Sequence, residues 1–345
     1  MQHSPDIRRA ALHDWLSEQP ALRADPSTLT MVAGDASFRR YFRVQTNLSQ
    51  HASLILMDAP PPVEDIRPFV QVAELLAATG VSVPQVLVSD ADQGFLALSD
   101  LGDRTYATRL NSETADDMYR LAGSALLRMQ TALMPAACGL PAYDAVRLGA
   151  EMQLFVDWYV NRHLETALTA AERPALQTVF DLLTADALAQ PQVFVHRDYH
   201  SRNLMVLDAP AVTPGILDFQ DAVIGPLTYD LVSLLRDAYV EWPDEQVLDW
   251  AIRYWEKARA QGLPVPADAS EFFRQFEWMG LQRHLKVLGI FARLHYRDGK
   301  SAYLNDLPRV LGYARRVAER FSVFKPLARL FERLDGQTAQ VAYTF

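Results

Sequence analysis

Three polar residues at a fixed spacing carry the clearest chemical signal in the chain. Asp198 follows an apolar run, Asn203 comes five positions later, and Asp218 stands twenty positions after Asp198. An oriented carboxylate such as Asp198 can accept the proton of a substrate hydroxyl. Asn203 and Asp218 offer hard oxygen ligands that hold Mg²⁺ against a nucleotide triphosphate. The spacing therefore predicts a phosphoryl-transfer site that uses ATP and Mg²⁺.

Short apolar segments must place these side chains. The runs 193–195 and 215–217 are typical of buried strands; Asp198 lies three positions after the first, and Asp218 directly follows the second. His196 is expected to tie the loop to neighbouring backbone rather than to carry a proton. Asp230 opens a predicted helix over 231–236, and it is expected either to cap that helix or to brace the catalytic loop.

The hydrophobic periodicity changes along the chain. The first hundred residues predict a helix over 7–16, strands over 29–32, 38–44 and 54–57, a helix over 69–76 and a hairpin of 86–88 with 95–98. Beyond them the pattern predicts long helices over 112–132, 146–162, 172–188, 244–261, 270–294 and 300–321. A small sheet followed by a larger helical part predicts an α+β, bilobal, protein-kinase-like fold. We expect a nucleotide-binding lobe at 1–100 and a catalytic and acceptor-binding lobe at 101–345.

Composition and charge limit the class of protein. Half of the 345 residues are hydrophobic, and the single cysteine, Cys138, excludes an internal disulfide. No apolar run is long enough for a membrane span and the first residues do not form a signal peptide, so we expect a cytoplasmic protein without a membrane partner. The net charge of −9 argues against nucleic acid as a partner, and no obligate protein partner is indicated.

Several motifs resemble those of a known family. On 216–219, 225–226 and 229–231 the chain is similar to the aminoglycoside-phosphotransferase-like kinases, which phosphorylate small molecules. On 34–43, 57–61, 95–102 and 282–289 it resembles the branch of that family that phosphorylates the anomeric (C1) hydroxyl of N-acetylmuramate and N-acetylglucosamine in peptidoglycan recycling. The resemblance implies a bilobal fold, ATP as phosphoryl donor and a small sugar as acceptor.

The nucleotide side departs from the usual kinase pattern. Met57 stands at the end of the third strand, where kinases usually have the lysine that binds the α- and β-phosphates. Arg43 and Arg40 are the candidates to replace it, and strand alternation places them on opposite faces. Arg43 is preferred because it lies deeper in the strand. The complete set of predicted nucleotide-binding residues is Gly34, Ser37, Arg40, Arg43, Ser99 and Leu101.

The charge distribution bears on the acceptor. Residues 251–345 contain 16 Lys+Arg and 9 Asp+Glu, a net charge of +7, whereas residues 1–250 carry −16. A basic region suits the lactyl carboxylate of N-acetylmuramate better than a polycationic aminoglycoside. Candidates come from the catalytic loop, from the positions after the second aspartate, and from two basic residues three apart on one helix. The basic residues of the helix would equally suit a solvent-exposed helix face. The predicted acceptor-binding residues are His200, Arg202, Gln220, Asp221, Arg283 and Lys286.

Two other functions stay open at this point. The same fold with a different acceptor would be an aminoglycoside- or choline-type phosphotransferase. A nucleotide-binding pseudokinase is the other alternative, and its only support is the methionine at position 57. The sequence does not give the preferred sugar, the oligomeric state, the number of Mg²⁺ ions or the choice of ATP over GTP.

Overall fold

The computed structural model describes residues 6–34, 38–208 and 213–342. They divide into two compact units, the first made of residues up to 104 together with 205–221, and the second made of 105–204 and 222–345. The segment 205–221 therefore groups with the first unit, whereas the prediction assigned everything after residue 100 to the second lobe.

A five-stranded antiparallel sheet forms the first unit. Its strand order is β1-β2-β3-β5-β4, and all strands predicted for the first hundred residues are present with ends shifted by up to two residues. Their bounds are β1 Thr30–Gly34, β2 Arg40–Gln45, β3 Ser53–Asp58, β4 Val86–Asp90 and β5 Phe95–Ser99.

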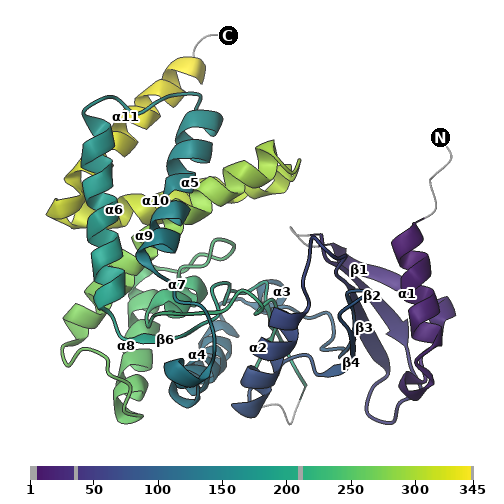
Figure 1. The fold of residues 1–345 in the computed structure, drawn as a ribbon. Helices are drawn as coiled ribbons and strands as arrows, with labels where there is room; N and C mark the ends of the chain where they lie inside the picture. Colours follow the sequence, from purple (N-terminus) through teal and green to yellow (C-terminus); the bar gives the residue numbers. More distant parts are fainter. Residues whose placement is uncertain (1–5, 35–37, 209–212, 343–345) are drawn as a thin grey trace. The chain divides into compact units, whose positions relative to one another are not determined.

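Two helices flank this sheet. Helix α1 (Ile7–Ser17) lies on one face and α2 (Arg67–Ala78) on the other, as Figure 1 shows. The α1 face holds a core in which Trp15 packs against Phe95 at 5.5 Å between ring centroids. The alternation of β2 gives this face Phe42, which is buried. Burial of these large side chains is the main force that holds α1 on the sheet.

The strand that leads to Asp218 is attached to the first unit by Ser82. Strand β8 (Gly215–Ile216) pairs with β7 (Leu204–Met205), and the N–H of Ile216 donates to the carbonyl of Ser82 at 2.8 Å. A methyl group at Gly215 would lie 2.9 Å from Cδ1 of Leu101, so glycine permits this close packing. These contacts explain why 205–221 joins the first unit.

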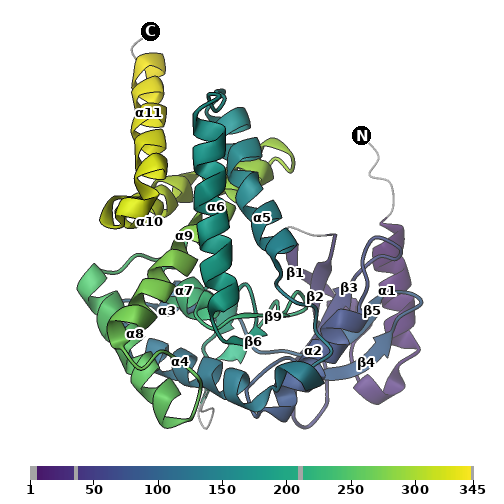
Figure 2. The same ribbon diagram turned by 60° about the vertical axis from the view of Figure 1, so that its left-hand side comes forward.

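The second unit is mostly helical. Its longest helix, α9, packs against α5, α6, α7, α8 and α10, and Figure 2 shows it among them. Strand β6 (Gln192–Val195), which precedes the catalytic motif, pairs with β9 (Val223–Pro226). The helices are α3 Tyr106–Arg109, α4 Ala115–Ala132, α5 Ala145–Leu154, α6 Glu172–Ala189, α7 Tyr229–Leu235, α8 Asp244–Ala260, α9 Ala269–Tyr296, α10 Leu307–Arg320 and α11 Lys325–Ala342.

The predicted helix over 146–162 is not one continuous α-helix. It is α5 followed by a π-helical segment, Phe155–His163. At the junction, α9 approaches so closely that a methyl group at Gly289 would lie 2.3 Å from the carbonyl carbon of Leu154. A close tertiary contact of this kind lies outside the reach of periodicity. The predicted helix over 300–321 also begins later, at Leu307, after a 3₁₀ segment.

Two further helices, α3 and α11, lie outside all predicted ranges. Among the described residues, no helix combines the length and the apolar character that a bilayer crossing requires.

Candidate active site

The loop after β6 holds Asp198 through backbone hydrogen bonds. The N–H groups of His196 and Arg197 donate to the two carboxylate oxygens of Asp230 at 2.6 and 3.0 Å. The N–H of Asp198 donates to Nδ1 of His196 at 3.2 Å. Asp230 and His196 are fully buried, whereas the side chain of Asp198 is 40% exposed. Asp230 and His196 thus hold the loop from its buried side, while the carboxylate of Asp198 stays partly exposed.

Backbone strain marks the same loop. Arg197, directly before Asp198, has φ +77°, in the left-handed region that non-glycine residues rarely adopt. Asn203 closes the loop, because its Nδ2 donates to the carbonyl of Asp198 at 3.0 Å and its N–H to the carbonyl of His200 at 2.9 Å. Because the amide nitrogen is committed to that carbonyl, Oδ1 is the atom that Asn203 can offer to a metal ion.

A buried network of charges supports the loop. Oε1 of Glu151 accepts from Nη2 of Arg197 at 2.5 Å and from Nζ of Lys286 at 3.1 Å. Arg283 donates to the carbonyl of Arg197 at 3.2 Å, and its Nη1 lies 4.0 Å from Oδ1 of Asp198. Three cations therefore face three carboxylates when Asp230 is included. Matched partners of this kind are the condition under which buried charges are tolerated.

The network sets the protonation of Asp198. Burial disfavours the charged carboxylate, but the positive charges of Lys286, Arg283, His200 and Arg197 outweigh it and hold the pKa of Asp198 at about 2. Asp198 is thus ionised throughout the physiological range. A carboxylate of this low basicity orients a hydroxyl and accepts its proton late, as phosphoryl transfer requires.

Burial has the larger effect on Asp230. It raises the pKa of that carboxyl to about 7, although the two backbone donors and Arg283 lower it.

The structure brings six of the predicted residues together in the second unit. Asp198 and Asn203 lie with the bracing pair His196 and Asp230, and Arg283 and Lys286 are on α9 behind the loop. The side chains of Arg283 and Lys286 are each only 6% exposed. Their polar contacts are with the loop, Glu151 and the hydroxyl of Tyr229. Sequence reasoning missed Glu151, which stands in no motif, and gave Tyr229 no role of its own although it belongs to the motif 229–231.

His200 and Arg202 take different environments in the loop. The His200 ring packs edge-on against Tyr239, with centroids 5.2 Å apart, and burial lowers its pKa. The next residue, Ser201, is buried and its N–H donates to Asp237 at 2.9 Å. Arg202 turns outward and is 48% exposed.

The first unit holds the other half of the predicted site. Asp218 has φ +63°, a second strained non-glycine residue, and its Oδ1 accepts from Nε2 of Gln220 at 2.8 Å. Gln220 also lies 3.5 Å from Oδ2 of Asp221, which is exposed. Phe219 packs on Phe69 of α2 with centroids 4.7 Å apart. The aromatic after the aspartate thus anchors this turn to the helix.

The two arginines predicted to replace the kinase lysine are bound to carboxylates. Nη2 of Arg43 donates to Asp100 at 3.0 Å and also to the carbonyl of Gly102 at 3.1 Å. Nη2 of Arg40 donates to the buried Asp58 at 2.6 Å, and a second contact joins it to Asp6. The two arginines lie on opposite faces, as alternation predicted, since Arg40 covers the Phe42 ring of the α1 face.

A different arginine, Arg39, pairs with a carboxylate that lies just before α2. Nε of Arg39 lies 3.3 Å from Oε2 of Glu64, and both side chains are largely buried, at 11% and 15% exposure. Oε1 of Glu64 also accepts from the N–H of Phe38 at 3.1 Å. The pair fixes the backbone where β2 begins.

The remaining predicted nucleotide residues lie in or beside the sheet. Gly34 ends β1 opposite Arg40, and Ser37 lies outside the described residues. The hydroxyl of Ser99 accepts from the N–H of Gln85 at 2.8 Å, which joins the ends of β4 and β5. Leu101 packs on Gly215, as described above.

The donor side chains limit the kind of metal site that the protein can form. Within the described ranges, no group of three or more His, Cys, Asp or Glu side chains is arranged to hold a metal ion. A site built from one carboxylate, one amide and phosphate oxygens would not form such a group, and it suits the hard ion Mg²⁺. Asp218 and Asn203 are therefore suitable in chemical type.

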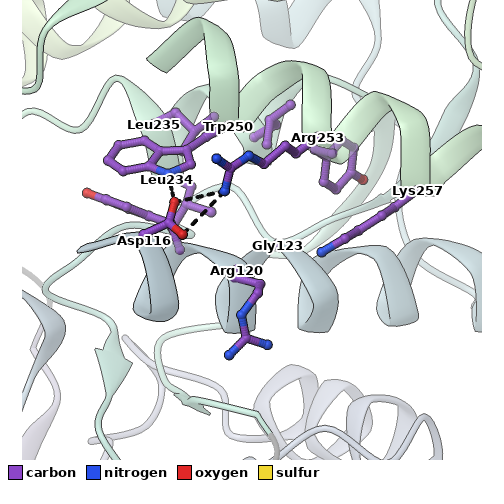
Figure 3. Close-up of a pocket in the computed structure, with 11 residues that line it drawn as sticks. Asp116, Arg120, Gly123, Leu234, Leu235, Trp250, Arg253 and Lys257 are labelled. Atoms are coloured by element: carbon purple, nitrogen blue, oxygen red, sulfur yellow. Dashed lines mark hydrogen bonds and ion pairs between the residues drawn. The ribbon is translucent and has the colours of Figure 1, made fainter. Parts of the chain in front are cut away.

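A hollow of about 70 Å³ lies elsewhere, between α4 and α8. In Figure 3, Asp116 accepts hydrogen bonds from Nε1 of Trp250 and Nη1 of Arg253, each at 2.9 Å. None of the predicted site residues lines it, so it is not the candidate active site.

Comparisons with known proteins show the family of the chain. The model of the phosphotransferase enzyme family matches residues 28–264. The chain is 46% identical to the N-acetylmuramate/N-acetylglucosamine kinase of Neisseria meningitidis over 98% of this chain and 99% of that protein. It is also 46% identical to the protein of the same name from Pseudomonas aeruginosa, over 96% and 98% of the two chains.

Solved structures bear on the fold. The choline kinase LicA from Streptococcus pneumoniae has a TM-score of 0.61 at 12% identity, covering 88% of this chain and 99% of that one. The GDP complex of aminoglycoside 2'-phosphotransferase-IIIa also has a TM-score of 0.61, at 15% identity over 92% and 100%. The predicted kinase-like fold is confirmed, and the catalytic motif, the fold and the family match agree that the chain belongs to the phosphotransferase enzyme family.

Proposed function

We propose that the protein phosphorylates the anomeric hydroxyl of N-acetylmuramate and N-acetylglucosamine with ATP, in peptidoglycan recycling. The observation that carries the proposal is 46% identity, over nearly the whole of both chains, to kinases named for these two sugars. The braced and ionised Asp198 is consistent with it. Because ATP is the donor, the reaction belongs in the cytoplasm.

Asp198 orients the C1 hydroxyl and accepts its proton. An anomeric hydroxyl is more acidic than an ordinary alcohol, so a carboxylate with a pKa of about 2 suffices. His196 and Asp230 hold the loop, which preserves the position of the carboxylate. Positioning is the larger part of this contribution.

Asn203 and Asp218 would hold Mg²⁺. The ion, when bound, neutralises charge on the phosphates of the nucleotide. The oxygen donors of both residues support this assignment, as does the strained backbone that fixes Asp218. Gln220, which donates to Asp218, orients that carboxylate and with Asp221 is available to acceptor hydroxyls.

Arg39, paired with Glu64, takes the role of the absent lysine. The support is its ion pair with a glutamate three residues before α2, because the lysine of kinases is held by a glutamate of a helix. Arg40 and Arg43 would have to give up close carboxylate partners to bind phosphate, and they are better suited to stabilising the sheet. Gly34, Ser37, Ser99 and Leu101 complete the nucleotide contacts.

One experiment tests the function directly. The purified protein is incubated with Mg-ATP and a panel that contains both sugars, choline and an aminoglycoside, and ³¹P NMR locates the phosphate. We expect an acid-labile C1 phosphate on the two amino sugars and no product with the Asp198→Ala variant. Phosphate on another hydroxyl, or on choline or the aminoglycoside alone, would refute the proposal. Equal turnover by the variant would refute the role of Asp198.

A further inference from the structure

The catalytic loop exposes one cation. Among the charged side chains of 196–203, that of Arg202 is the most exposed, at 48%, and that of Asp198 follows at 40%. The neighbours turn inward, since the hydroxyl of Tyr199 donates to the carbonyl of Ala122 at 2.9 Å and Ser201 is buried. The charges of Asp198 and Arg202 both act on the pKa of Tyr239, so the carboxylate and the guanidinium have one side chain as a common neighbour.

Aromatic rings hold this guanidinium in place. The central carbon of Arg202 lies 3.5 Å from the ring centroid of Tyr239 and 5.8 Å from that of Tyr303. Tyr239 is itself packed between His200 and Phe291, at 5.2 and 5.9 Å between centroids. Stacking on the Tyr239 ring restricts the guanidinium, although the side chain stays 48% exposed. Less side-chain freedom is then lost when a ligand binds.

The nearest carboxylate compensates Arg202 only weakly. Asp306 lies 3.9 Å away, but its Oδ1 accepts from Nη1 of Arg309 at 2.8 Å, and Arg309 also donates to the carbonyl of Ala238 at 2.7 Å. At 3.9 Å, and with the arginine side chain half exposed, this pair contributes little. The outward edge of Arg202 can therefore receive a second carboxylate without breaking a strong ion pair.

The two basic residues of α9 lack this freedom. Arg283 and Lys286 are almost fully buried, and their charges face Asp198 and Glu151. A ligand carboxylate could reach them only by displacing these partners, which is costly for buried charges. The exposed arginine of the loop is the better partner for an anionic acceptor.

We propose that Arg202, stacked on Tyr239 and Tyr303, recognises the carboxylate of an anionic sugar and so sets the preference for N-acetylmuramate over N-acetylglucosamine. This inference rests on the proposed function. The two sugars differ in the lactyl group, so the neutral sugar serves as an internal control. A planar guanidinium and a carboxylate form two parallel hydrogen bonds.

The test compares kcat/KM for both sugars in the wild type and in Arg202→Met and Arg202→Lys. We expect Arg202→Met to lose about 10- to 100-fold for N-acetylmuramate and less than about 3-fold for N-acetylglucosamine, mostly through KM. Arg202→Lys keeps the charge without the planar stack and should fall between. The control Arg120→Met removes a similarly exposed arginine from α4 and should leave kcat/KM unchanged for both sugars.

The outcomes separate the two proposals. A wild type that phosphorylates both sugars, with an Arg202→Met variant that loses equally on both or on neither, overturns the assignment of Arg202 alone. A wild type that phosphorylates neither sugar overturns the proposed function and this assignment with it. Because Arg202 is half exposed, its replacement should leave the thermal midpoint unchanged, and that measurement separates selectivity from misfolding.

Discussion

Replacing Glu151 by glutamine should lower the free energy of unfolding by about 3–5 kcal/mol, the usual cost of removing one member of a buried ion pair. The carboxylate is 12% exposed and faces Lys286 at 3.1 Å and Arg197 at 2.5 Å, and it accepts from the hydroxyl of Tyr143. An amide keeps a single acceptor and leaves both cations poorly matched. It also releases Arg197, so kcat should fall with stability.

Urea unfolding followed by tryptophan fluorescence is a suitable assay, because five of the six tryptophans are in the second unit. The control Glu241→Gln makes the same chemical change in the exposed pair with Arg316 and should cost less than about 1 kcal/mol. The double variant Glu151→Gln/Lys286→Met removes one charge of each sign, so its loss should be smaller than the sum of the single losses. Strict additivity, or a cost for Glu151→Gln no larger than that of the control, would refute the network.

Other predictions concern the nucleotide, the metal and pH. Asp218→Asn should abolish Mg²⁺-dependent turnover, and a Mg²⁺ titration with an unchanged midpoint would contradict its role as ligand. Arg39→Met and Glu64→Gln should each raise the KM for ATP by about tenfold and weaken Mg-ADP binding in calorimetry. Arg43→Met should mainly lower stability. A larger rise in KM for Arg43→Met than for Arg39→Met would restore Arg43 as the phosphate ligand. Burial raises the pKa of Asp230 in the folded protein to about 7 from a usual value near 3.8, so the contribution of this carboxyl to stability is full below pH 4 and is lost as the pH rises through 7. Over the same range kcat should rise, because the ionised carboxylate accepts the hydrogen bonds of the loop N–H groups. If Asp230→Asn leaves the acid side of the pH–kcat profile unchanged, this role of Asp230 is refuted.

Local patterns predicted a large part of the molecule. Strand alternation in β2 correctly placed Arg40 and Arg43 on opposite faces, and the helical repeat of Phe69 and Leu76 marked the buried side of α2. Both signals depend only on the periods of a strand and a helix, so a single segment of sequence contains them. The pattern did not show that α5 gives way to a π-helical segment, because that change occurs where another helix, 135 positions from Leu154, comes into contact.

Some features of the charged side chains could likewise be predicted from the sequence, and others were determined only by the tertiary structure. The spacing of Asp198, Asn203 and Asp218 and the family they indicate follow from the sequence alone, because residue type and interval are what the chemistry of phosphoryl transfer specifies. The partners of Arg43, Arg283 and Arg202 were decided by the tertiary structure, since these lie 57, 86 and 37 or more positions away. A charge in a sequence has no fixed role until folding determines whether it is buried against a carboxylate or exposed on an aromatic ring, and that depends on segments that no local pattern connects.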